Sequence, residues 1–124
     1  MASETITAPG GLEINVDHGE NGALVRLNGR LSIDSSPALR ECLLPLLQRE
    51  PPQAVIVDLS EAPYIDLSGI ATLIEALKIA GNRKTTLHLK GMHGPFLHLL
   101  EVTGLMPLFE GTGRTDSQPV SRVN

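Results

Sequence analysis

Apolar and polar residues alternate in the first quarter of the chain in a way that predicts two β-strands. Leu12, Ile14 and Val16 are separated by single polar residues. A period of two places all three side chains on one face of a half-buried strand. The turn sequence HGENG follows, and the segment 23–29 (ALVRLNG) has the composition of a second strand. A short turn between two such segments predicts an antiparallel hairpin.

The apolar spacing becomes helical after residue 35. Ser36 is a candidate helix cap, and Pro37 suits the first helical position. Pro45 lies almost opposite the apolar face, which predicts a kink toward solvent rather than a break. Four leucines share one face of this predicted helix: Leu39, Leu43, Leu46 and Leu47.

A second strand and helix follow. The segment 54–60 (AVIVDLS) is continuously apolar and rich in β-branched residues, which predicts a central strand covered on both faces. From Gly69 onward, apolar residues recur at helical spacing and predict a helix over 69–80. Gly81 is the predicted stop of this helix.

The last third of the chain predicts three shorter elements. The segment 85–91 alternates as a strand. Gly94 and Pro95 open a short helix that ends near Gly104. The segment 105–110 (LMPLFE), with Pro107 at its centre, predicts an extended piece at the sheet edge.

The predicted order is β-β-α-β-α-β-α, which indicates an α/β fold with a mixed β-sheet and helices packed on it. We expect one domain over 12–110. Residues 1–11 and 111–124 are small, polar and interrupted by Gly or Pro, so both are expected to be flexible. The sheet edge where the strand 54–60 runs into the helix 69–80 is a typical place for function.

The amino-acid composition disfavours some classes of binding partner. The 124 residues are 41% hydrophobic and 19% charged, as in a single globular domain. Aromatic residues make up 2%, and the net charge is −4, which disfavours a nucleic-acid partner. Cys42 is alone and excludes an internal disulfide. The sequence contains neither a signal-peptide pattern nor a long apolar run, so we expect a cytoplasmic protein without membrane insertion.

The sequence gives little support for a phosphate-binding loop, a metal site or a serine hydrolase. The segment GNRKTT lacks the spacing of a phosphate-binding loop. His88, His93 and His98 recur every five residues, a spacing that does not converge on a helix, and no metal site is expected. Ser68 lies in D-L-S-G-I rather than G-x-S-x-G, so a serine hydrolase is a weak alternative. We expect no cofactor and no catalytic residue.

The joint between the strand 54–60 and the helix 69–80 contains Asp66, Leu67, Ser68 and Gly69. Asp66 or Ser68 can cap the helix by accepting a hydrogen bond from its free amides. Alternatively, the joint is a functional site, because the Ser68 hydroxyl lies in an apolar surface at a helix N-terminus. A phosphate there is expected to be tolerated, since amides and the helix dipole favour an anion.

Three segments resemble the STAS domain family, and within it the single-domain anti-sigma-factor antagonists of bacteria. These segments are Gly29-Arg30-Leu31, VIVDLSEAPYIDLSGIATLIEAL and FLHLLEVTGLMPLFE. The resemblance runs from about Leu12 to Phe109. It implies the STAS fold and a protein-binding function without enzymatic activity.

The resemblance also implies a switch. Ser68 matches the serine that is phosphorylated in these antagonists by a partner anti-sigma factor, itself an ATP-dependent serine kinase. The unphosphorylated domain binds the anti-sigma factor and frees a sigma factor. The phosphorylated domain dissociates from the anti-sigma factor, and a serine phosphatase removes the phosphate. ATP is then bound by the partner kinase, and the chain itself needs no cofactor.

The expected partner face is the 30–36 loop together with the start of the helix 69–80. Leu67 and Ser32 depart from the family pattern, which commonly has a serine and an acidic residue there. A phosphate on Ser68 adds negative charge near carboxylates of this face. The expected contact residues are Ser32, Asp34, Asp66, Leu67, Gly69 and Ile70.

Related STAS domains suggest a different partner as an alternative. Some serve as adaptor subunits of lipid ABC transporters, and in that case the partner is a transporter complex rather than a kinase.

Overall fold

One mixed five-stranded sheet organises the computed structural model, which describes residues 2–109. Its strands, in sheet order, are β1 (Ala2–Ala8), β2 (Leu12–Gly19), β3 (Gly22–Leu31), β4 (Ala54–Ile65) and β5 (Leu87–Lys90). The helices are α1 (Ser36–Leu47), α2 (Leu67–Arg83), α3 (Gly94–Thr103) and α4 (Met106–Phe109). The predicted mixed α/β class is therefore confirmed, with β1 and α4 as additional elements.

The sheet has an antiparallel half and a parallel half. β1 pairs antiparallel with β2, and β2 with β3, so the predicted hairpin is confirmed. β3, β4 and β5 pair in parallel, each pair joined through a helix. Because β3 and β4 are parallel, their ends at Leu31 and Ile65 lie side by side at one edge of the sheet.

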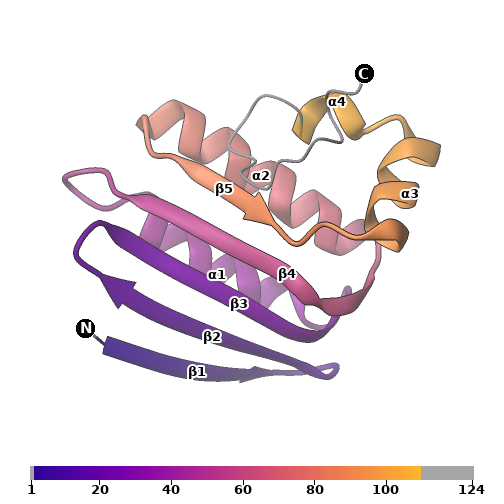
Figure 1. Ribbon diagram of the computed structural model, residues 1–124, viewed down its shortest axis with the longest axis horizontal. Helices are drawn as coiled ribbons and strands as arrows, with labels where there is room; N and C mark the ends of the chain where they lie inside the picture. The colour runs from indigo at the N-terminus through magenta and orange to yellow at the C-terminus, as the bar shows by residue number, and fades with distance from the viewer. Residues whose placement is uncertain (1, 110–124) are drawn as a thin grey trace.

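α1 and α2 lie on the same face of the sheet (Figure 1). Both belong to crossovers that step in the same direction across the sheet, and right-handed crossovers then place their helices on one side. Val57 of β4 is buried toward the helices, whereas its neighbours Ile56 and Asp58 are only half-buried. The prediction that 54–60 is covered on both faces is therefore wrong.

The core is aliphatic and closes at one end with two aromatic rings. The four leucines predicted to share one face of α1 are all buried, and Pro45 lies exposed on the same helix. Phe96 of α3 and Phe109 of α4 meet edge to face, with ring centroids 5.8 Å apart. No helix within residues 2–109 has both the length and the apolar composition needed to span a membrane.

The surfaces of α1 and α2 are joined by an ion pair. Arg40 of α1 donates through Nε and Nη2 to the two carboxylate oxygens of Glu75 on α2, at 2.8 Å each. The hydrogen bond from Arg40 lowers the pKa of the Glu75 carboxyl. This pair links the two helices on their exposed side.

The prediction of a flexible segment over residues 1–11 is wrong for Ala2–Ala8, which form β1. Ser3 Oγ donates to Asp17 Oδ1 at 2.7 Å, and Thr5 Oγ1 donates to Asn15 Oδ1 at 2.9 Å. The polar residues of β1 thus pair with polar residues of β2, so a polar sequence forms a strand. The predicted tail 111–124 lies outside the described residues.

Several predicted boundaries are corrected by local hydrogen bonding. α1 begins at Ser36 with Ser35 as N-cap, so Ser36 is not the cap and Pro37 is the second helical residue. α2 continues past Gly81 to Arg83 and ends at Lys84, whose φ of 59° is left-handed. The segment predicted to be extended around Pro107 instead forms the helical turn α4.

Gly69 is required by the close packing of α2 against β3. A Cβ atom at this position would lie 2.7 Å from Leu31 Cγ and 3.1 Å from the Leu31 carbonyl oxygen. The backbone of Gly69 is helical, so the constraint is space rather than backbone conformation. Gly81 lies on the same helix and has no atom within 4 Å of such a Cβ.

We predict opposite effects of alanine at these two glycines. Gly69→Ala should destabilise the fold by about 1–3 kcal/mol, because Leu31 or α2 must shift. Gly81→Ala should stabilise it by about 0.5–1 kcal/mol, because alanine costs less than glycine within a helix. Urea denaturation of both variants measures the free energies of unfolding, and equal effects would contradict the packing account.

Candidate functional site

Asp66 caps α2 at the joint where β4 ends. Its backbone is extended, with φ −111° and ψ −174°. One carboxylate oxygen accepts from Ser68 N at 2.9 Å and from Gly69 N at 3.2 Å. These are two of the amides that a helix N-terminus leaves without a partner in the helix. Of the two candidate caps, Asp66 is therefore the one the structure uses.

The same residue holds the end of β3 and the loop that follows it. Its second carboxylate oxygen accepts from Ile33 N at 3.2 Å. Its backbone N–H donates to the Leu31 carbonyl at 3.1 Å. Asp66 therefore connects the end of β3, the loop before α1 and the start of α2.

The loop between β3 and α1 is held by its own serines. Ser32 N donates to Ser35 Oγ at 2.9 Å, and Ser35 Oγ donates to the Arg30 carbonyl at 2.7 Å. Ser36 Oγ donates to the Ser32 carbonyl at 2.7 Å. Ser32 is 7% exposed and its hydroxyl accepts from Asp34 N. Ser32 thus shapes the loop from inside.

Three exposed apolar residues lie on the segments that meet at the joint. Ile33 is 69% exposed, Leu67 54% and Tyr64 41%. Arg30 lies over the Tyr64 ring, with its Cζ 3.9 Å from the ring centroid. We call Ile33, Tyr64 and Leu67 the joint patch. Large apolar side chains grouped at a surface mark an interaction site more often than single ones do.

Ser68 lies beside the joint patch, and its side chain is free. The residue is half-buried, and its hydroxyl makes no hydrogen bond within residues 2–109. Its backbone N–H, however, is bonded to Asp66, and its carbonyl accepts from Thr72 Oγ1 at 3.1 Å. Two of the amides expected to favour an anion at Ser68, those of Ser68 and Gly69, are therefore already bonded to a carboxylate.

The predicted contact residues divide by exposure. Asp34 and Leu67 are exposed, and Asp66 is half-buried with both oxygens engaged. Ser32, Gly69 and Ile70 are buried and support the loop and the start of α2, and their contact with a partner stays a prediction. Sequence reasoning did not single out Ile33. Its signal was an isolated apolar residue in a turn of polar ones.

The histidines take separate positions. His93 Nε2 lies 2.7 Å from the Ala62 carbonyl oxygen, His88 is on β5 and His98 is exposed on α3. Among the residues that the structure describes, no cluster of three potential metal ligands occurs. Within this part of the chain, no histidine hydrogen-bonds to the Ser68 hydroxyl, so the arrangement lacks the paired base of a serine nucleophile.

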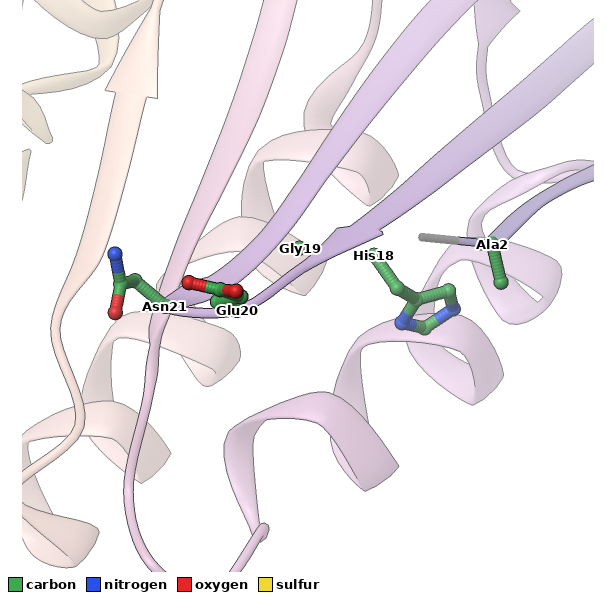
Figure 2. Close-up of a pocket in the computed structure, with 5 residues that line it drawn as sticks. All are labelled: Ala2, His18, Gly19, Glu20 and Asn21. Atoms are coloured by element: carbon green, nitrogen blue, oxygen red, sulfur yellow. The ribbon is translucent and has the colours of Figure 1, made fainter.

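A hollow of about 830 Å³ lies at the turn between β2 and β3, close to the start of β1. It is lined by Ala2, His18, Gly19, Glu20 and Asn21. Figure 2 shows Glu20 and Asn21 at the turn and His18 farther along, so their side chains do not converge on one point. His18 is engaged with Arg49 at 2.8 Å and with Glu4 at 3.4 Å. The side chains that line this hollow therefore do not form a convergent ligand site.

Comparisons with known proteins agree with the fold. The family model described as "Mlab, STAS domain" matches residues 14–110. The anti-sigma-B factor antagonist of Bacillus subtilis is 25% identical over 85% of this chain and 96% of its own length. That of Staphylococcus epidermidis is 31% identical over 71% of this chain and 83% of its own.

A solved structure shows a similar fold. The anti-sigma factor antagonist SpoIIAA in its unphosphorylated form superposes with a TM-score of 0.65 at 11% identity, covering 85% of this chain and 89% of that one. At this identity the likeness supports the fold alone.

We predict that the joint depends on Asp66. Asp66→Ala removes the acceptors of three backbone amides and should destabilise the fold by about 1–2 kcal/mol. Asp34→Ala is the matched control, because that carboxylate is exposed in the loop that Asp66 bonds through Ile33, and it should change stability by less than about 0.5 kcal/mol. Urea denaturation gives both values. Faster hydrogen exchange of the Ile33 amide in Asp66→Ala alone should accompany them; equal exchange in both variants would contradict the assignment.

Proposed function

The chain belongs to the STAS domain family, and we propose that it acts as an anti-sigma-factor antagonist switched by phosphorylation of Ser68. The observation that carries this proposal is an unbonded serine hydroxyl beside an exposed apolar patch at the start of α2. Relatives at 25% and 31% identity bear the name anti-sigma-B factor antagonist, which supports the choice of partner class.

The unphosphorylated joint patch is the binding surface in this proposal. Ile33, Tyr64 and Leu67 offer apolar area that a partner removes from water. Binding of the anti-sigma factor here leaves the sigma factor free. The loop and α2 are held together through Asp66, so the patch is preorganised and little ordering is needed on binding.

Phosphorylation changes the charge of this surface. The Ser68 Oγ forms a bond to the γ-phosphorus of ATP, the bond from that phosphorus to the β–γ bridging oxygen breaks, ADP leaves, and the hydroxyl proton passes to the kinase. The product carries about −1.5 to −2 additional charge at neutral pH. Asp34 and Asp66 already place negative charge around the patch, on a chain of net charge −4. The partner is then released.

The anti-sigma factor is the kinase in this scheme and binds the ATP, and a serine phosphatase removes the phosphate. The chain contributes a substrate hydroxyl and a binding surface but no catalytic group, and it needs no cofactor. An adaptor role in a lipid ABC transporter is the rival within the same class of binding proteins. Recovery of a permease and its ATPase instead of a serine kinase in a pull-down would favour that rival.

We predict that the cognate anti-sigma factor and ATP place one phosphate on Ser68, as mapped by mass spectrometry. Ser68→Ala should abolish the modification and retain the partner in the presence of ATP. Ser60→Ala is the matched control, because Ser60 is an exposed serine on β4 that bonds to Asp58. Phosphate on another residue, with Ser68 unmodified, would refute the switch.

We predict that Leu67 contributes directly to partner affinity. Leu67→Ala should weaken binding of the unphosphorylated chain about tenfold or more, since truncating a central apolar contact costs about 1.4 kcal/mol or more. Val102→Ala on α3 is the matched control, because Val102 is 63% exposed but lies outside the joint patch. Isothermal titration calorimetry measures both, and similar losses in the two variants would place the partner elsewhere.

A further inference from the structure

Three backbone amides close to Ser68 in the joint donate to one carboxylate. Asp66 accepts from Ser68 N and Gly69 N through one oxygen, at 2.9 and 3.2 Å, and from Ile33 N through the other, at 3.2 Å. Free amides in the first turn of a helix are the groups that bind a phosphate in many proteins. At this helix the amides of Ser68 and Gly69 are already bonded to the Asp66 carboxylate. A phosphate on Ser68 therefore meets a helix N-terminus at which these two amides already have a partner.

The charged groups around the joint come from three elements. Asp66 stands between β4 and α2, and Asp34 lies in the loop before α1. Arg30, at the end of β3, is stacked over the Tyr64 ring at 3.9 Å. The first turn of α2 has the sequence Leu-Ser-Gly-Ile and brings no charge of its own. Two carboxylates and one stacked guanidinium thus lie on the segments that meet at the joint.

We infer that Asp66 determines the consequence of phosphorylating Ser68, an inference that rests on the proposed function. The Asp66 carboxylate keeps the phosphate off the amides of α2 and off the Ile33 amide. The dianion then stays at the surface of the joint patch, where it opposes the partner. Asp66 is a positioning residue in this account, because it acts on the phosphate and takes no part in phosphoryl transfer.

Two variants separate the charge of Asp66 from its role as a cap. Asp66→Asn retains an oxygen that accepts from Ser68 N and Gly69 N, and asparagine is a good N-cap, so the domain should fold. It removes the negative charge and the acceptor for Ile33 N. Asp34→Asn removes a carboxylate of the same loop that makes no hydrogen bond to α2 within residues 2–109, and serves as the matched control.

Phosphorus NMR tests the inference without any kinase. Phosphoserine is installed at position 68 during synthesis, in the otherwise unchanged chain and in both variants, and the phosphate resonance is followed against pH.

In the unchanged chain the phosphate pKa should lie above its ordinary value of about 6, because a carboxylate opposes the second ionisation. Asp66→Asn should lower this pKa, and Asp34→Asn should lower it less. Titration of each chain unfolded in urea gives the reference pKa of its phosphate in the absence of the folded joint. A pKa at or below the reference in the unchanged chain would overturn the inference, because the phosphate then sits on the amides.

The second readout is affinity for the cognate anti-sigma factor. Phosphoserine at 68 should weaken binding of the unchanged chain, and it should weaken binding of Asp66→Asn at least about tenfold less, which corresponds to one pKa unit of interaction. An equal loss in both chains would overturn the inference. If the unphosphorylated chain fails to bind an anti-sigma factor at all, the proposed function is wrong, while the phosphate titration still decides the role of Asp66.

Discussion

The carboxylate of Asp66 is the constraint on which the candidate site depends. Its two oxygens accept from three backbone amides, and these belong to α2 and to the loop before α1. Ile33 and Leu67 belong to two different segments, the loop before α1 and the start of α2. With the Asp66 carboxylate, they form one surface, because the loop and the helix start are bonded to the same side chain. The joint patch is therefore a product of helix capping rather than of a separate binding loop.

The topology explains why the patch forms at this edge of the sheet. β3 and β4 are parallel neighbours, so their ends, and the starts of α1 and α2 that follow, lie side by side (Figure 1). Gly69 allows the first turn of α2 to approach Leu31 closely. At the opposite edge, the turn between β2 and β3 carries the hollow of Figure 2, whose polar side chains point apart. The first edge combines close packing at Gly69 with the exposed apolar residues of the joint patch.

Much of the fold followed from hydrophobic periodicity, because long apolar segments such as 54–60 and the leucine face of α1 have one stable arrangement. The sequence predicted less where polar groups satisfy one another. β1 was missed because Ser3 and Thr5 pair with Asp17 and Asn15, a pattern that local composition does not reveal. Ser32 was predicted as a surface contact, whereas its burial results from bonds to serines three and four residues on. The choice of Asp66 over Ser68 as the cap likewise depends on a geometry that spacing alone leaves open.

Magnitudes indicate why a serine next to a capping carboxylate suits a binding switch. The dipole of a helix stabilises a nearby anion by about 0.3–1 kcal/mol. Two unit charges about 4 Å apart repel by about 1 kcal/mol in water and about 4 kcal/mol near a protein surface, and a phosphate dianion doubles the interaction. At that distance, repulsion by Asp66 would exceed the attraction of the helix end, which the dianion doubles as well. At a helix whose amides were free, a phosphate would bind to them and present less charge to a partner. At this helix Asp66 already accepts from the amides of Ser68 and Gly69, so under the proposed switch the charge of a phosphate on Ser68 remains available to oppose binding.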